Sequence, residues 1–426
     1  MTSTEPIPLP ASRSGRARPP RRRLSIGWWT TVAAAGLISV MTAPGQTAGL
    51  SVFTDPLIDG LGIDRTAIAL SYLIGTLIGA AAQPLVGRAV DRWDVRHVIV
   101  AIAVVFAGIL FALSLVADVI GLTAGFVGVR LTGQGALSLA VTTAVSRAVV
   151  HRRGLALGIS AAIGSAGISL APIALERLIA AVGIQAAWRW EALAVLVLVI
   201  PAALLIRRPE APRQDGRSSP AEGWTLAEAR RTGMFWVVTA AVGTTSMLGT
   251  ALAFHQIAVL GERGLSPFEA AANFLPQTVT ALVATLGVGA LIDRADPRIF
   301  LVFSMLSMAG ALLMVSVVST GWPAIAYGLV LGCAGGSLRG VEAATFARYY
   351  GVAHIGTIRG VTWAIAMAAS ALGPYALALG AELAGGFALP SAVLAGIPLC
   401  VVIAASMVRP PRRRGTIEAG SGGGRR

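Results

Sequence analysis

A few charged and amide side chains lie inside long apolar stretches of this 426-residue chain, where they are candidates to bind a polar solute. Arg339 and Glu342 are three residues apart, so on a helix they share a face. A guanidinium offers a planar fork that binds a carboxylate through two hydrogen bonds. Arg339 is therefore the leading candidate to hold an anionic substrate, and Glu342 is the candidate to carry a coupled proton. The alternative is an internal Arg339–Glu342 ion pair with no substrate role.

Four more polar residues are candidates for contact with a substrate. A charged group at the centre of a membrane helix costs about 2.5–3.5 kcal/mol on insertion scales, so each one needs a partner or a function. Arg130 and His255 are expected either to contact substrate or to be satisfied structural groups. Gln256 is a third candidate. Gln46 is the fourth, because Pro44-Gly45 before it can unwind a helix. Further possible lining residues are Thr47, Ser51, Tyr72, Asn273, Gln277, Trp363 and Tyr375.

The composition excludes a soluble enzyme. Hydrophobic residues make up 55% of the chain and charged residues only 13%, whereas soluble domains carry roughly 25% charge. The four histidines (97, 151, 255 and 354) are scattered, and Cys333 and Cys400 form no zinc-binding spacing. No nucleotide-binding motif is present, so we expect no cofactor and no metal. A polytopic membrane enzyme or a sensor is a remote alternative.

The elements that must position these residues are membrane-spanning helices. About 20 apolar residues cross a bilayer, and the chain holds twelve such runs. They are 27–51, 66–87, 97–117, 121–145, 155–182, 188–206, 234–260, 267–291, 299–319, 323–346, 358–381 and 387–408. Every basic residue is Arg, and 28 of the 34 lie in the two tails or in alternate connections. The positive-inside rule then places both termini in the cytoplasm of a multi-pass cell-membrane protein. The clustering of Arg between spans argues against a nucleic-acid partner.

The chain repeats itself at an offset of 202 residues. The pattern G-x-x-x-D-R-x-D-x-R begins at Gly87 and again at Gly289, and the same offset pairs Thr76 with Thr278 and Pro172 with Pro374. Two repeats of six spans enter the membrane in the same sense, related by a pseudo-two-fold axis along the membrane normal. We therefore predict an all-α membrane protein of two six-helix bundles, 25–206 and 233–408. A cytoplasmic linker (207–232) joins them, and disordered basic tails (1–24 and 409–426) flank them.

The loop after the second span resembles the signature loop of the major facilitator superfamily at Gly87, Asp91, Arg92 and Arg96. The resemblance implies a cytoplasmic latch, in which Asp91 pairs with Arg147 and faces the start of the eleventh span. Asp293 and Arg294 would form the second latch, with Arg348 or Arg359 as partner. The alternative is that these residues simply mark a tight turn. Gly164, Gly167 and Pro172 resemble the superfamily's fifth-helix motif, which implies close packing, and Pro172 and Pro374 are expected to bend matched helices.

Several short phrases resemble the monocarboxylate and oxalate/formate porters of that superfamily. They are Pro44-Gly-Gln-Thr with Ser51-Val-Phe53, Arg152-Arg-Gly, Trp188-Arg-Trp190, Tyr349-Tyr-Gly and Gly356-x-x-Arg-Gly360. The chain departs from them because the eighth span has no Arg and the chain has no Lys. The resemblance implies a monomeric secondary transporter that moves a small solute, above all an organic anion, by alternating access. An ion is the expected co-transported or exchanged species. The alternative is a proton-coupled exporter of drug-like amphipathic compounds.

Overall fold

The structure is a computed structural model of the whole chain. It describes residues 26–149, 152–207, 224–292, 294–351, 354–408 and 411. The two predicted tails fall almost entirely outside these residues, as do positions 208–223 of the predicted linker. Asp293 of the second signature loop also lies outside them.

All the elements in the described residues are helices. The first half contains α1 (Ile26–Val40), η1 (Ala43–Gly45), α2 (Thr47–Ser51), α3 (Thr54–Leu61), α4 (Arg65–Arg92), α5 (Val95–Leu113), α6 (Val119–Val129), η2 (Arg130–Leu137), α7 (Ser138–Ala148), α8 (Arg153–Val182) and α9 (Ile184–Leu205). The second half contains α10 (Leu226–Ala229), α11 (Gly233–Phe254), α12 (Gln256–Gly261), α13 (Pro267–Ala272), α14 (Phe274–Leu291), α15 (Pro297–Met314), α16 (Trp322–Tyr350), α17 (Ile355–Ala384), α18 (Ala388–Leu394) and α19 (Gly396–Met407).

Eleven helices in the described residues are long and apolar enough to cross a membrane. The prediction of twelve spans differs at the fourth, which is not one regular helix. It runs through α6, η2 and α7 without a gap, and η2 (Arg130–Leu137) is a π-helix. A π segment widens the turn and re-aims the side chains at its start, and such segments are frequent at functional sites. Here the residue at its start is Arg130.

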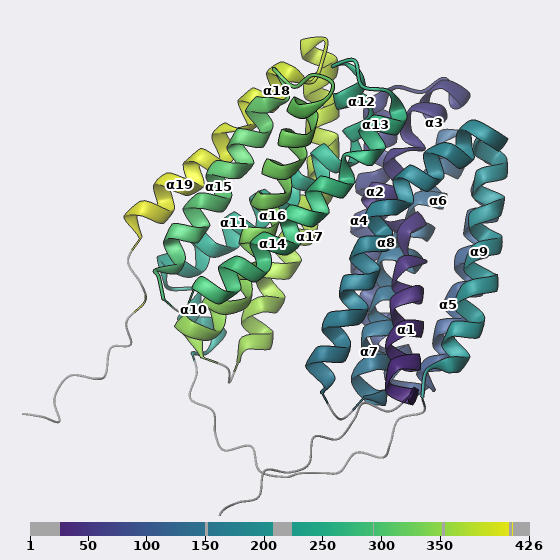
Figure 1. The fold of residues 1–426 in the computed structure, drawn as a ribbon, viewed down its shortest axis with the longest axis horizontal. Coiled ribbons are helices and arrows are strands. Elements are labelled where there is room, and N and C mark those ends of the chain that lie inside the picture. The colour runs from purple at the N-terminus through teal and green to yellow at the C-terminus, as the bar shows by residue number, and fades with distance from the viewer. Residues whose placement is uncertain are drawn as a thin grey trace, which may run out of the picture.

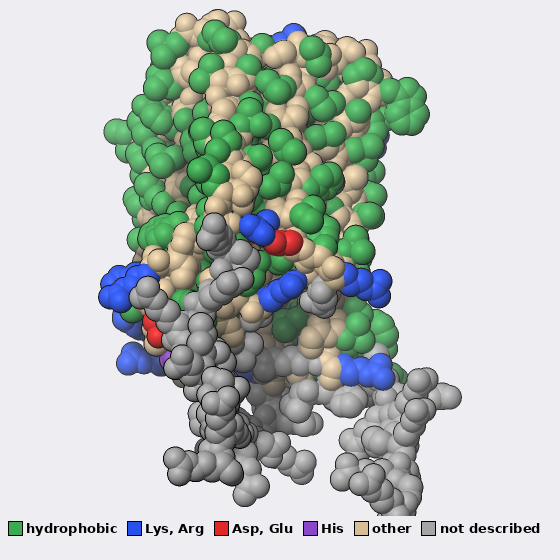
Figure 2. Space-filling model, turned by 90° about the vertical axis from the view of Figure 1, so that its left-hand side faces the viewer, with side chains coloured by type: hydrophobic (Ala, Val, Ile, Leu, Met, Phe, Trp, Pro, Cys, Tyr) green, Lys and Arg blue, Asp and Glu red, His purple; other side chains and the backbone are tan. Residues whose placement is uncertain are grey.

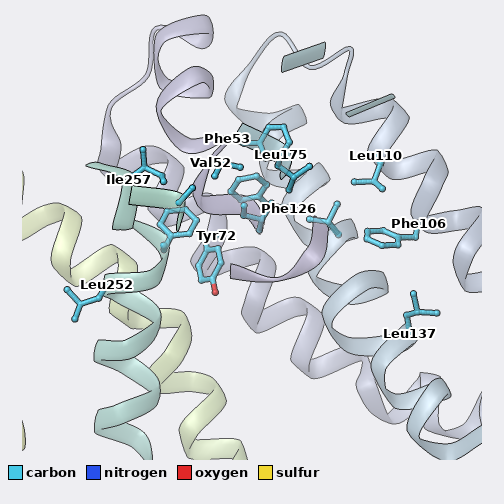
Figure 3. Close-up of a cluster of buried hydrophobic side chains, with 14 of the residues drawn as sticks. Val52, Phe53, Tyr72, Phe106, Leu110, Phe126, Leu137, Leu175, Leu252 and Ile257 are labelled. Atoms are coloured by element: carbon cyan, nitrogen blue, oxygen red, sulfur yellow. The ribbon is translucent and has the colours of Figure 1, made fainter. Parts of the chain in front are cut away.

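The helices form two groups that lie side by side, α1–α9 and α11–α19 (Figure 1). Within each group the helices pack in pairs, such as α1 with α8 and α14 with α16. Between the groups, α4 packs on α17, while α8 packs on α13 and α14. A buried apolar cluster crosses this boundary, because Tyr72 of the first half lies near Leu252 and Ile257 of the second (Figure 3). The two groups meet at the end of the molecule where α3, α12 and α13 lie.

Arginine gathers at one end of the molecule. Arg92, Arg147 and Arg348 lie where α4, α7 and α16 end, and we call this the Arg-rich end. Figure 2 shows one face of the molecule, with a hydrophobic band above and most of the visible basic side chains below it. The end that holds α3, α12, α13 and α18 is called the opposite end. This separation fits a protein whose apolar band lies in lipid.

The predicted packing residues lie in two long, unbroken helices. Helix α8 continues through Pro172 and α17 through Pro374, so neither proline ends its helix. At Gly164 and Gly167, α8 runs close to α1. A Cβ on Gly164 would lie 2.6 Å from Ser39 Cβ, and one on Gly167 would lie 2.3 Å from Val40 Cγ2. The chain breaks instead at η1 in the first span and at His255 in the seventh.

Candidate functional site

A cavity of about 520 Å³ lies between the two halves. Its polar lining comes from the break in the first span and from α11, α14 and α16. The lining side chains that carry polar groups are Gln46, Thr47, Thr245, Ser246, Thr250, Gln277, Thr278, Arg339 and Glu342. Most of these belong to the second half, so the two halves contribute unequally to the site.

The cavity is closed toward the opposite end. Glu382 of α17 accepts a hydrogen bond from the Thr66 amide at the start of α4, at 3.0 Å. The Tyr72 and Phe254 rings are 4.5 Å apart, and the Arg177 guanidinium lies 4.6 Å from the Phe268 ring centroid. Within the described residues, every hydrogen bond and ring contact between the two halves lies either at this end or near the middle of the helices. The cavity therefore opens toward the Arg-rich end.

Arg339 projects from α16 into this cavity. Its side chain is exposed there, and in the described part of the chain it has no hydrogen-bonding or ionic partner. The internal pair with Glu342 that the sequence offered as an alternative is not formed. Glu342 instead accepts a hydrogen bond from Arg359 of α17, with Arg359 Nη2 3.2 Å from Glu342 Oε1. Arg339 thus presents an uncompensated guanidinium to any solute in the cavity.

Arg130 has a different environment and does not line the cavity. Its side chain is only 3% exposed. Its Nε donates to Thr76 Oγ1 at 3.0 Å, and its Nη1 donates to the Gly45 carbonyl at 3.2 Å. The guanidinium also lies over the Tyr72 ring, 4.6 Å from the centroid. Because the Gly45 carbonyl belongs to the 3₁₀ turn in the first span, Arg130 stabilises the break that turns Gln46 and Thr47 toward the cavity.

The break in the first span also depends on tight packing. A Cβ on Gly45 would lie 2.4 Å from the Val129 carbonyl oxygen, so only glycine fits where η1 meets the fourth span. Gln46 Nε2 donates to Thr42 Oγ1, and the hydroxyls of Thr47 and Tyr72 lie 2.7 Å apart. These bonds fix the first-half side of the cavity.

Gln256 and His255 lie behind the cavity wall. Gln256 is fully buried, donates to the Ala270 carbonyl, and accepts from Gln277 Nε2 at 2.7 Å. Gln277 is the member of this pair that reaches the cavity. His255 is fully buried as well, and its Nε2 donates to the Pro374 carbonyl at 2.9 Å. In this conformation His255 ties the break between α11 and α12 to α17, away from any solute.

The signature-loop residues pair within each half. Arg147 Nη2 lies 2.7 Å from Asp91 Oδ1, and Arg147 Nη1 donates to the Val90 carbonyl. In the second half, Arg348 Nη1 donates to the Ile292 carbonyl at 2.8 Å, which repeats the Arg147 arrangement. In the described residues Asp91 forms no hydrogen bond or ion pair with α17, as expected when the Arg-rich end is open. The latching role of these residues, Arg359 included, stays a prediction.

A glycine stripe on α16 was not singled out from the sequence. Gly328, Gly332, Gly336 and Gly340 recur every four residues, the spacing that lets helix backbones approach closely. A Cβ on Gly332 would lie 2.1 Å from the Gln277 carbonyl oxygen of α14. One on Gly336 would lie 2.2 Å from the Ala281 carbonyl oxygen. The stripe lets α16 pack closely against α14, while the face of α16 that carries Arg339 and Glu342 lines the cavity.

This arrangement of two joined helical groups around a central cavity matches a known family. The family profile of the Major Facilitator Superfamily matches residues 35–374, from the first span into the eleventh. The chain belongs to the Major Facilitator Superfamily. The superfamily prediction made from the signature loop is therefore confirmed. As a member of this superfamily, the protein is a secondary transporter that binds a small-molecule solute, and it is not an enzyme.

One curated relative of this superfamily member is the oxalate:formate antiporter of Oxalobacter formigenes. The two chains are 28% identical over 242 residues, which is 54% of each chain. The match thus spans about half the length of that relative.

Solved structures share the fold of this superfamily member. The nucleoside transporter NupG has a TM-score of 0.73 at 13% identity, over 90% of this chain and 98% of that one. A bacterial homolog of the human lysosomal transporter Spinster, in an inward-facing and occupied conformation, has a TM-score of 0.70 at 16% identity, over 90% and 96%. At these identities the likeness shows the fold alone.

Proposed function

We propose that this transporter moves a small organic anion with a carboxylate group, and that Arg339 anchors that carboxylate. The observation that carries the proposal is the guanidinium of Arg339, which faces the cavity and has no partner in the described residues. Arginine's fixed fork of N–H donors matches a carboxylate through two parallel bonds.

The charges around the cavity favour an anion over a cation. Two charged groups line the cavity in the described residues, Arg339 and Glu342. The Glu342 carboxylate is already compensated by Arg359, so Arg339 leaves the cavity with one excess positive charge. A cationic solute would bring a second positive charge beside Arg339 without a counter-charge, and a strongly apolar solute would cover the guanidinium without pairing it; both cost free energy.

The polar lining supports a small and hydrophilic solute. Gln46, Gln277 and Thr245 offer hydrogen-bonding groups within the same cavity. A volume of about 520 Å³ lies within the range of small-molecule sites, and it leaves room for water around a monocarboxylate or dicarboxylate. The name of the antiporter relative adds oxalate and formate as the first anions to try.

The distribution of arginine supports an orientation with the Arg-rich end in the cytoplasm. The cavity would then be open to the cytoplasm in this structure, as in the inward-facing Spinster homolog. Rocking of the two halves about the cavity would expose Arg339 to the other side. The contacts at the opposite end, such as Glu382 with Thr66, would break in that step.

A ligand-stabilisation assay tests the proposal. Purified protein is heated with oxalate, formate, lactate or succinate, and separately with hydrophobic cations. A ligand that binds only the folded state stabilises it by about 2.7 kcal/mol at 100 times its Kd. We expect a carboxylate to raise the unfolding temperature of the wild type, and Arg339→Gln to weaken that binding about 10- to 100-fold.

Arg189→Gln is the matched control, because Arg189 donates to Ser114 away from the cavity and should leave binding unchanged. Stabilisation by hydrophobic cations alone, equal in wild type and Arg339→Gln, would refute the anion proposal and favour an exporter of drug-like compounds.

A further inference from the structure

Three charged side chains on α16 and α17 form only one ion pair in the described structure. Arg339 and Glu342 are one helical turn apart on α16, and Arg359 lies on α17. Glu342 pairs with Arg359, at 3.2 Å, while Arg339 has no partner in the part of the chain that the structure describes. The cavity lining and its mouth thus hold two guanidinium groups and one carboxylate, which compensates only Arg359.

The two arginines differ in how much they need that carboxylate. The Arg359 side chain is 47% exposed at the open mouth, so water can solvate it. Arg339 lies deeper in the cavity, and it is solvated only while the cavity is open to one side. When the Arg-rich end has closed and the opposite end has not yet opened, Arg339 loses water and needs a negative partner, because an unpaired buried charge costs several kcal/mol.

Two groups can supply that partner. A bound carboxylate does so when the transporter is loaded. When it is empty, Glu342 is the one other acid that lines the cavity among the described residues. At a spacing of three residues on one helix, the Cβ atoms are about 5–6 Å apart, so the two long side chains can meet by rotamer changes alone.

We propose that Glu342 is an internal counter-ion that moves from Arg359 to Arg339 when the empty transporter closes its Arg-rich end. In this role Glu342 stands in for the substrate and lets the empty protein return without a bound anion. A transporter with this device can carry net flux. Without it, only the anion-loaded form reorients, and the protein becomes an obligate exchanger. The inference rests on the proposed anion function for its transport consequence, and on the three side chains alone for its conformational one.

The conformational part can be tested without a known substrate. Cys333 and Cys400 are the two cysteines of the chain, and both are replaced by Ser. Ser246→Cys then places one thiol in the cavity lining. Reconstituted protein without any anion is treated with a membrane-impermeant maleimide from the opposite side. The labelling rate reports how often the empty protein opens to that side.

We expect Glu342→Gln to slow this labelling at least about tenfold, which corresponds to ~1.4 kcal/mol against the closed empty form. The double variant Arg339→Gln with Glu342→Gln should restore it to within about threefold of the starting protein, because the deep charge is gone and water solvates the exposed Arg359. Arg359→Gln is the control that frees Glu342 for Arg339, and it should not slow labelling. Normal labelling in Glu342→Gln, or a double variant as slow as Glu342→Gln, would overturn the proposal.

The transport part uses labelled oxalate and formate in proteoliposomes. Glu342→Gln should lose net uptake into empty vesicles about tenfold while it keeps exchange against internal anion. Loss of exchange as well as net uptake would contradict the counter-ion role. Proton movement with the anion in the wild type, absent from Glu342→Gln, would show that Glu342 is a proton carrier and would contradict it too. Failure of the anion proposal is seen separately, as absence of carboxylate exchange in the wild type with the labelling pattern intact.

Discussion

The substitution Gly332→Ala tests whether the close contact between α16 and α14 builds the cavity. An added Cβ at position 332 lies 2.1 Å from the Gln277 carbonyl oxygen, and ordinary contact begins at 3.4 Å. The two helices must therefore separate by about 1 Å, and overpacking of this kind costs about 1–3 kcal/mol. Alanine returns about 0.5–1 kcal/mol through its better helix propensity. The shift also displaces Gln277, whose side chain bonds Gln256 and lines the cavity.

Gly287→Ala is the matched control, because a Cβ at this position on α14 meets nothing within 4 Å. In a thermal-unfolding assay on purified protein, we expect Gly332→Ala to unfold about 1–3 °C below Gly287→Ala, because the gain in helix propensity is common to both variants. The carboxylate that stabilises the wild type should also bind more weakly to Gly332→Ala. Equal unfolding temperatures for the two variants would refute the argument that backbone contact at Gly332 fixes the position of α14.

Three further variants probe the site, the loop and the closed end. Arg130→Met should change the unfolding temperature little, because removal of a buried cation offsets the lost hydrogen bonds. It should nevertheless weaken carboxylate binding at least about tenfold, because the break in the first span loses its support. Unchanged binding would contradict this role of Arg130. The hydrogen bond from Arg298 holds the pKa of Asp296 below its usual 3.8, so its stabilisation is present above that pH and is lost as pH falls further. The gap in unfolding temperature between wild type and Asp296→Asn should therefore narrow below about pH 3.8, and a constant gap would count against the pair. Glu382→Gln weakens the contact between this carboxylate and the start of α4 at Thr66, which is worth about 0.3–1 kcal/mol. Maleimide labelling of the Ser246→Cys thiol from the opposite end should therefore rise about two- to fivefold. No rise would show that other contacts keep that end closed.

The π-helix in the fourth span is a feature that hydrophobic periodicity does not predict. Hydropathy predicts an apolar run over 121–145 but does not indicate that η2 is a π-helix. The extra width of that turn aims Arg130 at the Gly45 carbonyl, 85 positions earlier in the chain. The equivalent position in the second half is Gly332, which lies in regular helix. The two halves therefore use the same place in the fold differently, one for a buried cation and one for a backbone contact.

The sequence by itself determined the spans, the duplication, the arginine-rich side and the short set of deep charged groups. These features are local or repetitive, because lipid forces each span to satisfy its own backbone hydrogen bonds within a helix. The glycine stripe on α16 was not among these predictions, although its spacing of four is a signal that the sequence contains.

Only the tertiary structure decided which deep arginine is free. Arg130 and Arg339 look alike in the sequence, since each lies within an apolar run. Arg130 finds Thr76 and the Gly45 carbonyl through the packing of three spans, and Arg339 loses Glu342 to Arg359 because α17 lies beside α16. Which end of the cavity is closed depends likewise on contacts between the halves, more than 100 residues apart in the chain. Partner choice over such distances is set by how the helices pack, and no local pattern records it.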